Sequence, residues 1–168
     1  ACVVQNKLQA VNAAAFDLSA ACSGFVYAMS VGSQFIQSGM YKKVLIVAAE
    51  SLSKITNWED RNTCVLFGDG AGAAVLGPVE EGYGILGVEL GADGSGAEFL
   101  HMPAGGSLYP ATLETVKNKM HYIHMNGNEV FKFAIKIMGE AAYKALEDAG
   151  LDTKDVDCLI PHQANIRI

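Results

Sequence analysis

The chain has 168 residues and a mass of 17.8 kDa, 51% of its residues are hydrophobic, and its mean hydropathy is +0.22. That much apolar material excludes a disordered chain and is enough for the core of an ordinary domain. The net charge is −6 and there are only two arginines, Arg61 and Arg167, so no basic stripe exists for a phosphate backbone and nucleic-acid binding is excluded.

The cysteines form no CxxC pair, and no histidine accompanies them at metal-ligand spacing. Nothing near the N-terminus resembles a signal peptide. We therefore expect reduced thiols, no bound metal and a cytoplasmic protein. The chain starts without a methionine and stops directly after a polar cluster, which predicts an internal piece of a longer protein.

The first expected elements in chain order are a buried strand over residues 13–18 and a helix over residues 22–37 that ends at Ser38-Gly39. Residues 18–41 carry no charge, but their glycines, serines and glutamines make them too polar for a membrane span. We expect instead a helix that is buried on nearly every side. A β-branched run over residues 43–49 completes a strand-helix-strand pattern, which is typical of a parallel α/β sheet.

Two more strands are expected over residues 66–76 and 84–90, the second bounded by glycines. The first contains "FGDGAGAAVLG", residues 67–77, which resembles a nucleotide-binding glycine loop. Gly77-Pro78 follows too soon to leave room for the phosphate-binding helix. We therefore interpret these small residues as places where the backbone is closely approached in a packed strand pair.

The second half of the chain combines a long loop with a strong helix. Residues 91–121 are rich in glycine, proline and polar side chains and predict a functional or mobile loop. Residues 128–149 carry apolar side chains at helical spacing, with Gly150 as the stop. A short strand over residues 157–161 precedes "HQANIRI", so these polar groups stand where α/β proteins carry their chemistry, at the carboxyl end of a strand.

Cys22 stands where the first strand meets the charge-free helix. The free N–H groups and the dipole of a helix N-terminus favour a thiolate, which makes Cys22 a candidate nucleophile. The alternative is a small buried hydrophobic residue, which is common for a free cysteine. The other three cysteines fall in apolar runs and are assigned to the core. Ser23 lacks a GxSxG frame, so we do not expect a serine nucleophile.

Other polar candidates admit two interpretations each. His162 is either a base paired with Cys22 or a hydrogen-bonded histidine at a strand end. His121 and His124 lie three residues apart with no carboxylate or thiol to complete a metal site, so we expect them to face solvent. The segment "NWEDRNT", residues 57–63, is either a platform for a ring and an anion or an ordinary polar loop.

Together, five ordered blocks resemble the β-ketoacyl-acyl-carrier-protein synthase III family, the initiating condensing enzymes of bacterial fatty-acid synthesis. "DLSAACSGF" resembles the nucleophile motif, "NWEDRNTCVLFGDGAGAAVLGP" the central block, "GADGSG" and "NGNEVFKFA" the next landmarks, and "IPHQANIRI" the histidine motif. The resemblance implies an incomplete α/β fold of the thiolase-like type. Residues 1–79 would be the end of its first strand-helix half and residues 80–168 the start of its second.

The resemblance also implies roles for individual residues. Cys22 is similar to the thiol that takes the acyl group from acyl-CoA, and His162 to the histidine that assists the decarboxylative step. Residues similar to those of the coenzyme A and pantetheine channel are Trp58, Arg61, Gly127, Phe131 and Asn165. Arg167, with Lys132, is similar to part of the docking surface for the acidic carrier protein, which an acidic enzyme needs as a local basic patch.

The reaction implied is the decarboxylative Claisen condensation of an acyl-CoA, here expected to be acetyl-CoA, with malonyl-acyl-carrier protein. Its product is a 3-oxoacyl-acyl-carrier protein that initiates fatty-acid synthesis. The coenzyme A thioester is a substrate and no cofactor is implied; the full-length protein would be a homodimer, with no membrane partner. The family's catalytic asparagine belongs to a later Gly-Asn motif beyond Ile168, and Asn165 is not that residue. The chain alone is therefore expected to be inactive in condensation.

Three other functions stay open at this point. One is a thiolase-like condensing enzyme that makes a polyketide or quinolone precursor. Another is a Cys-His hydrolase, although the charge-free helix after Cys22 implies a dry site that would keep hydrolytic water away. The last is a non-catalytic remnant that only dimerises or binds carrier protein.

Overall fold

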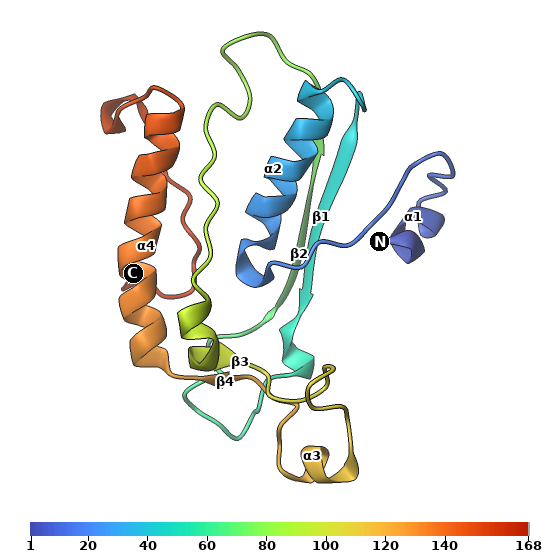
Figure 1. The fold of residues 1–168 in the computed structure, drawn as a ribbon, viewed down its shortest axis with the longest axis vertical. Helices are drawn as coiled ribbons and strands as arrows, with labels where there is room; N and C mark the ends of the chain where they lie inside the picture. Colours follow the sequence, from blue (N-terminus) through green and yellow to red (C-terminus); the bar gives the residue numbers. More distant parts are fainter. Residues whose placement is uncertain (168) are drawn as a thin grey trace. The chain divides into compact units, whose positions relative to one another are not determined.

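A computed structural model describes residues 1–167 and divides the chain into two compact units. The first unit contains residues 1–48 and 72–80, and the second contains residues 49–71 and those from 81 onward. Strands β1 (Val44–Ser51) and β2 (Asp69–Leu76), labelled in Figure 1, each have residues in both units. The expected division at residue 79 into two thiolase-like halves stays a prediction, and Ile168 lies outside the described residues.

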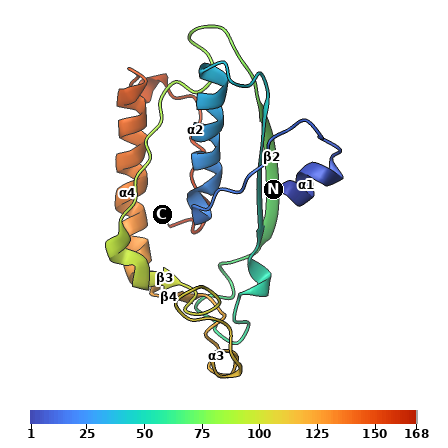
Figure 2. The same ribbon diagram turned by 45° about the vertical axis from the view of Figure 1, so that its right-hand side comes forward.

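The first unit is built on helix α2 (Gly24–Gln37), which confirms the helix predicted from the charge-free run. The helix ends before Gly39, whose φ of +73° is the left-handed conformation usual after a helix C-terminus. Strands β1 and β2 pair in a two-stranded sheet beside α2 (Figure 2). The contact runs through Gly32, where a Cβ would stand 3.0 Å from Leu76 Cδ1 and 3.2 Å from Ile46 Cδ1. Glycine at this position therefore sets how closely the helix approaches the sheet.

An aromatic cluster covers part of α2. The Phe35 ring meets Phe16 edge to face with centroids 6.4 Å apart, and meets Tyr41 in the same way at 5.6 Å. Each such pair contributes about 0.5–1.5 kcal/mol beyond its buried area. The cluster ties the irregular segment before α2 and the turn after it to the last turn of the helix. Helix α1 (Cys2–Lys7) precedes this segment.

Three expectations for the first unit are wrong. Residues 13–18 form no strand, and the sheets of the described residues contain none that could pair with them. Only Gly32 and Ser33 of α2 are buried, while Phe25 and Val26 are exposed, because a single face of the helix meets a sheet here. The glycines inside β2 are not closely approached either, since a Cβ at Gly70 or Gly72 would meet nothing within 4 Å; only at Gly77, after the strand, would a Cβ stand 2.9 Å from Lys43 Nζ. The strand pair itself is confirmed.

The second unit contains short elements and one long helix. Strands β3 and β4 are antiparallel, with Leu100 opposite Met125 and His101 opposite His124. The loop expected over residues 91–121 is therefore interrupted by regular structure. In chain order the elements are η2 (Leu52–Lys54), η3 (Gly94–Phe99), β3 (Leu100–His101), α3 (Leu113–Lys117), β4 (His124–Met125), α4 (Gly127–Asp148) and η4 (Thr153–Asp155).

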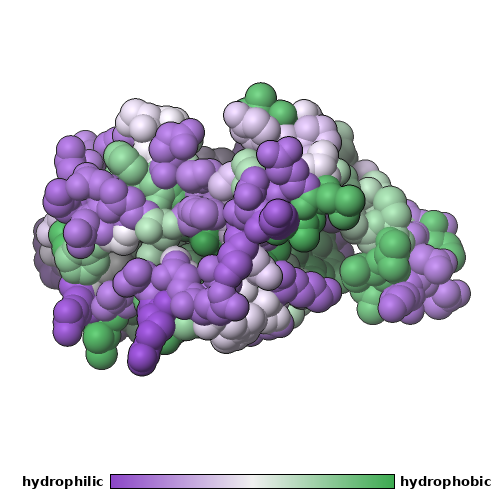
Figure 3. Space-filling view, turned by 90° about the horizontal axis from the view of Figure 1, so that it is seen from below, coloured by the Kyte–Doolittle hydropathy of each residue, from purple (hydrophilic) through white to green (hydrophobic). Residues whose placement is uncertain are grey.

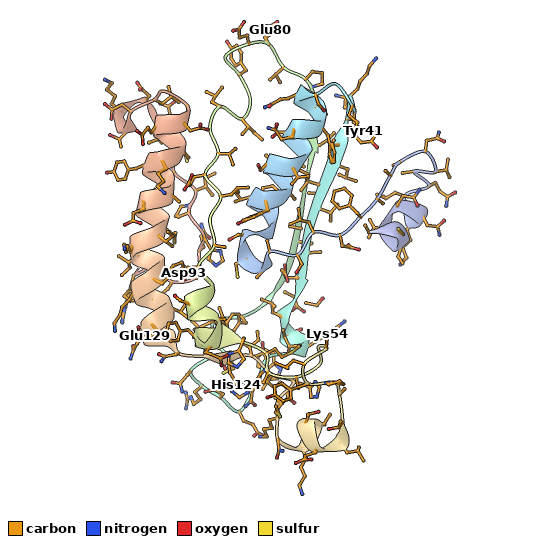
Figure 4. The ribbon with its side chains drawn as sticks, viewed as in Figure 1. Tyr41, Lys54, Glu80, Asp93, His124 and Glu129 are labelled. Carbon is orange, nitrogen blue, oxygen red and sulfur yellow. The ribbon has the colours of Figure 1, made fainter. Side chains whose placement is uncertain are left out.

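Helix α4 confirms the strongest prediction from the sequence. Asn126 caps it, because the Asn126 side-chain oxygen accepts a hydrogen bond from the Glu129 N–H at 3.4 Å. Figure 4 labels Glu129 in the first turn, where the helix dipole favours a carboxylate. At the other end Gly150 adopts a φ of +67° and stops the helix as expected.

The segment over residues 84–90 is extended but forms no strand, so that prediction is wrong. The segment bonds to α4 instead of to another strand: the Val88 N–H donates to Asp148 Oδ2 at 3.0 Å, and Lys144 pairs with Glu89 at 3.0 Å. It approaches so closely that a Cβ at Gly87 would stand 2.2 Å from the carbonyl oxygen of Ala145. Residues 157–161 form no strand either.

Little of the apolar material is buried. Among the described residues the buried hydrophobic ones are Ile46, Ala104 and Ile123, and Figure 3 shows apolar side chains open to solvent on the face it draws. The accessible surface is 12,877 Å². A folded protein of this mass exposes about 8,000 Å², and two separate globules divided as the two units are would expose about 9,500 Å². No helix in the described range is long and apolar enough to cross a membrane.

Candidate active site

Cys22 lies in the short helix η1 (Ala21–Ser23), which leads directly into α2. The turn is closed by a hydrogen bond from the Ser23 N–H to the Ala20 carbonyl at 3.1 Å. Ala21 has a φ of +45°, a left-handed conformation that costs a residue with a Cβ about 1–2 kcal/mol. Cys22 is exposed, so the turn presents an accessible thiol next to the unpaired N–H groups of a helix N-terminus.

Exposure does not distinguish Cys22 from the other thiols. Cys2 and Cys158 are exposed and Cys64 is half-buried, and all four cysteines are free. Assigning the other three to the core was therefore wrong for this chain. Cys2 Sγ lies 3.8 Å from the Ala15 carbonyl oxygen. Cys2 also begins a helix, α1, so what sets Cys22 apart is the left-handed residue Ala21 directly before it.

Trp58 and Arg61 lie on a loop of the second unit, residues 57–63, hereafter the 57–63 loop. Both side chains are exposed, with Trp58 65% accessible. The loop is folded around Asp60, whose carboxylate accepts hydrogen bonds from the Asn62 N–H at 3.0 Å and the Thr63 hydroxyl at 2.8 Å. These two bonds, the backbone one first, hold the pKa of Asp60 below its usual value. Thr63 is 1% accessible, so a buried polar anchor supports an exposed aromatic ring and guanidinium.

A second carboxylate holds together the two ends of the segment between β1 and β2, residues 52–68, hereafter the excursion. Asp69 accepts hydrogen bonds from the Ser53 hydroxyl at 2.6 Å and from the Ser53 N–H at 2.8 Å. The hydroxyl bond first, and then the backbone bond, lower the pKa of Asp69. The same excursion buries Thr56, which is 1% accessible and donates its hydroxyl proton to the Leu52 carbonyl at 2.8 Å. The 57–63 loop is thus built on a base held by charge-assisted hydrogen bonds.

The structure brings the 57–63 loop to the start of α4. The Ile123 N–H donates to the Ile55 carbonyl at 2.9 Å, so residue 123 is tied to the chain two residues before the 57–63 loop. Residue 123 is followed by β4 and then by Gly127, the first residue of α4. Phe131, one turn further along α4, is half-buried. Four of the five predicted coenzyme contacts therefore lie on two neighbouring segments of one unit.

The two basic residues predicted to dock carrier protein differ in their surroundings. Lys132 pairs with Glu129 one turn earlier on α4 at 2.7 Å, so its charge is partly neutralised. Arg167 is exposed, and its N–H donates to Asn165 Oδ1 at 3.0 Å in a turn that follows His162. His162 is also exposed. Cys22 belongs to the first unit and His162 to the second, and their pairing stays a prediction.

The other histidines contact neighbouring side chains that the sequence did not indicate. The His124 ring stacks on the His101 ring with centroids 6.1 Å apart, across the β3–β4 pair, and Figure 4 shows His124 there. His121 is half-buried and its Nε2 lies 2.9 Å from the Thr115 hydroxyl oxygen, so the prediction that it faces solvent is wrong. His124 is exposed, as predicted. Within residues 1–167, no three histidine, cysteine or carboxylate side chains group in a way that could hold a metal ion.

A cavity of about 580 Å³ beside β3 was not anticipated from the sequence. It is lined by His101, Met102, Leu108 and Tyr109, among others, and by none of the predicted site residues. Buried His101 Nδ1 has no hydrogen-bond partner in the part of the chain that is described. The only signal for this feature was the long polar loop, which gave no reason to expect a cavity.

Comparisons with known proteins identify this arrangement. The profile of the 3-oxoacyl-[acyl-carrier-protein (ACP)] synthase III family matches residues 16–94, which include Cys22 and the 57–63 loop. The β-ketoacyl-[acyl-carrier-protein] synthase III of Desulfitobacterium hafniense (strain DSM 10664 / DCB-2) is 64% identical over all 168 residues. The chain belongs to the β-ketoacyl-acyl-carrier-protein synthase III family. The resemblance read from the five sequence blocks is thereby confirmed.

Solved structures of related enzymes have the same fold as this chain. The 3-oxoacyl-[acyl-carrier-protein] synthase III from Aquifex aeolicus VF5 matches 99% of the chain with a TM-score of 0.86 at 46% identity. The priming β-ketosynthase from the R1128 polyketide biosynthetic pathway also matches 99% of it, with a TM-score of 0.83 at 38% identity. The expected incomplete thiolase-like α/β fold is therefore confirmed.

The chain spans about half the length of the synthase III proteins it matches. It covers 51% of the Desulfitobacterium protein, 49% of the Aquifex chain and 48% of the polyketide ketosynthase. The surplus of exposed apolar surface agrees with a fold whose elements are only partly present in these 168 residues.

Proposed function

We propose that this chain carries the acyl-transfer site of a β-ketoacyl-acyl-carrier-protein synthase III. The proposed reaction condenses an acyl-CoA, acetyl-CoA first among them, with malonyl-acyl-carrier protein and so initiates fatty-acid synthesis. The observation that carries the proposal is 64% identity, over every residue of the chain, to a protein of that name. The accessible thiol of Cys22 at the start of α2 supplies the nucleophile that the reaction needs.

In the first half-reaction the Cys22 thiolate attacks the carbonyl carbon of the acyl-CoA thioester. The new S–C bond forms as the old one breaks, and coenzyme A leaves as its thiolate and takes a proton. The Cys22 N–H is proposed as a donor to the oxyanion that develops on the carbonyl oxygen. Trp58, Arg61, Gly127, Phe131 and Asn165 are proposed to hold the coenzyme and pantetheine during this step.

In the second half-reaction malonyl-carrier protein loses carbon dioxide, and the electron pair of the broken bond forms an enolate. His162 is proposed to donate a hydrogen bond to the enolate oxygen. The carbanion then attacks the acyl-Cys22 carbonyl and releases the thiolate. The family's second donor, an asparagine, is not among these residues, and losing one such donor lowers the rate by about 10²–10³. We expect the 168-residue chain alone to be inactive in condensation.

The proposed partners follow from the same reaction. Arg167 and Lys132 are proposed to receive the acidic carrier protein, with Lys132 released from Glu129 as the partner binds. A homodimer of the full-length protein, a cytoplasmic location and the absence of any cofactor besides the coenzyme A thioester are part of the same proposal. A priming ketosynthase of polyketide type is a second candidate, favoured by the 38% identity to such an enzyme. The acyl-CoA that is accepted would distinguish the two.

Intact-protein mass spectrometry after incubation with acetyl-CoA tests the nucleophile. We expect one acetyl adduct on the parent chain and none on Cys22→Ala. Cys158→Ala is the matched control, because Cys158 is another exposed free thiol outside any helix N-terminus. An adduct that survives in Cys22→Ala, or one lost in Cys158→Ala, would contradict the assignment. Modification with longer or branched acyl-CoA but not with acetyl-CoA would favour the polyketide-type alternative.

A further inference from the structure

Helix α3 ends in an unusual way. The Lys119 N–H bonds to the Val116 carbonyl at 3.0 Å and the Met120 N–H to the Thr115 carbonyl at 3.0 Å, which is the pattern of a Schellman motif. This motif places Lys119 in the left-handed conformation, with a φ of +57°. Glycine is the usual residue there, and the chain uses it after α2, at Gly39, and after α4, at Gly150. A lysine at this position keeps a backbone strain that glycine would remove.

The side chain of Lys119 makes a contact that glycine could not make. Its ammonium group pairs with the Glu59 carboxylate, 60 residues earlier in the chain. The pairing lowers the pKa of Glu59 and raises that of Lys119. Gln9, the other non-glycine residue in the left-handed conformation directly after a described helix, also uses its side chain, which donates to the Asn6 carbonyl at 2.8 Å. Both strained positions thus carry a side chain with a definite partner.

Glu59 lies at the tip of the 57–63 loop, directly after Trp58 and two residues before Arg61. The base of the excursion is fixed by Asp69, and Asp60 folds the loop on itself. Neither contact ties the tip to the rest of the unit. The segment that carries Lys119 is anchored, because the Ala104 N–H bonds to the Met120 carbonyl at 2.9 Å and the Ile123 N–H to the Ile55 carbonyl. The ion pair therefore joins the tip to a fixed point.

We propose that Lys119, through its ion pair with Glu59, is a positioning residue that holds Trp58 and Arg61 in place for the coenzyme A part of the acyl-CoA substrate. The proposal rests on the proposed function for the identity of that ligand. The pair is half-exposed, at 53% for Lys119 and 78% for Glu59, so its effect is modest and sensitive to salt. We expect about two- to fivefold weaker coenzyme A binding when it is removed.

Lys119→Gly separates positioning from a merely structural role. Glycine relieves the left-handed strain, so the variant should unfold at the same denaturant concentration as the parent or at a higher one. It also removes the ion pair, so the loop should become more mobile. Trp58 is the only tryptophan, and its fluorescence anisotropy reports that mobility directly. Lower anisotropy together with undiminished stability is the expected result; unchanged anisotropy would overturn the proposal.

The controls use the other long-range ion pair of the same unit. Glu89→Gln breaks the Lys144–Glu89 pair on α4 and should leave Trp58 anisotropy unchanged, whereas Glu59→Gln should lower it as Lys119→Gly does. Exchanging the charges, with Glu59→Lys and Lys119→Glu together, should restore it. Coenzyme A titrations of the same variants measure affinity. A parent that binds no coenzyme A counts against the proposed function, while the anisotropy decides separately whether the ion pair holds the loop.

Discussion

The contact between the 84–90 segment and helix α4 gives a prediction whose size can be worked out from distances. A Cβ added at Gly87 would stand 2.2 Å from the Ala145 carbonyl oxygen, where real contacts are essentially never below 3.0 Å. The segment must therefore move away by about 0.8 Å. That shift stretches the Val88–Asp148 hydrogen bond from 3.0 Å to about 3.8 Å, beyond bonding range. Overpacking costs about 1–3 kcal/mol and the lost bond about 1 kcal/mol more, so Gly87→Ala should destabilise the second unit by about 2–4 kcal/mol.

Gly139→Ala is the matched control, because Gly139 lies inside α4 with open space where the Cβ would go. It should stabilise the helix by about 0.5–1 kcal/mol, since glycine lowers helix stability relative to alanine. Urea unfolding followed by circular dichroism measures both variants, and hydrogen exchange of the Val88 amide reports the local contact. Equal stability of Gly87→Ala and the parent, with unchanged protection of Val88, would refute the argument from close approach.

Three further predictions concern the first unit, the base of the 57–63 loop and the surface. Ala21→Gly should raise stability by about 0.5–1 kcal/mol in thermal unfolding, because relief of the left-handed strain exceeds the entropy that glycine adds to the unfolded chain, and a lower melting temperature would contradict this. Asp69 has a lowered pKa, so its bonds to Ser53 contribute stability above the usual aspartate pKa, and this contribution is lost as pH falls through the lowered value. Asp69→Asn should therefore make stability fall less steeply with decreasing pH in acid titrations followed by circular dichroism. Parallel curves for the variant and the parent would argue against it. The exposed apolar surface should bind a hydrophobic dye such as ANS more strongly than an ordinary globular protein of equal mass does, and weak binding would show that this surface is covered in solution.

The sequence was sufficient where a local signal decides the structure. Helix α4 has apolar periodicity, a capping Asn126 and a stop at Gly150, and all three act within the segment itself. Strand β1 was predicted from its β-branched run, and it pairs with β2, which begins 18 residues after β1 ends. These elements needed no information about distant parts of the chain.

The predictions failed where a segment depends on a partner. The runs over residues 13–18, 84–90 and 157–161 have strand composition, but a strand exists only when a neighbour accepts its ladder hydrogen bonds. In the described residues the 84–90 segment bonds instead to two side chains of α4, Asp148 and Lys144. Two long-range contacts of the site also left no pattern in the sequence: the hydrogen bonds of Asp69 with Ser53 and the ion pair of Lys119 with Glu59. Neither residue type nor spacing marks such a contact between distant segments.

The two parts of the proposed site differ in how completely their structural surroundings are present in these 168 residues. The groups proposed to hold coenzyme A stand on a loop with buried threonine anchors, a closed base and a neighbouring helix start, all within one unit. The nucleophile stands on a turn whose helix keeps only one face covered, so the dry surroundings that strengthen oxyanion stabilisation are absent around it. Coenzyme binding and acyl transfer should therefore separate in this chain. Measurable affinity for coenzyme A, alongside acetylation that is selective for Cys22 but slow, is the combination that these two environments predict.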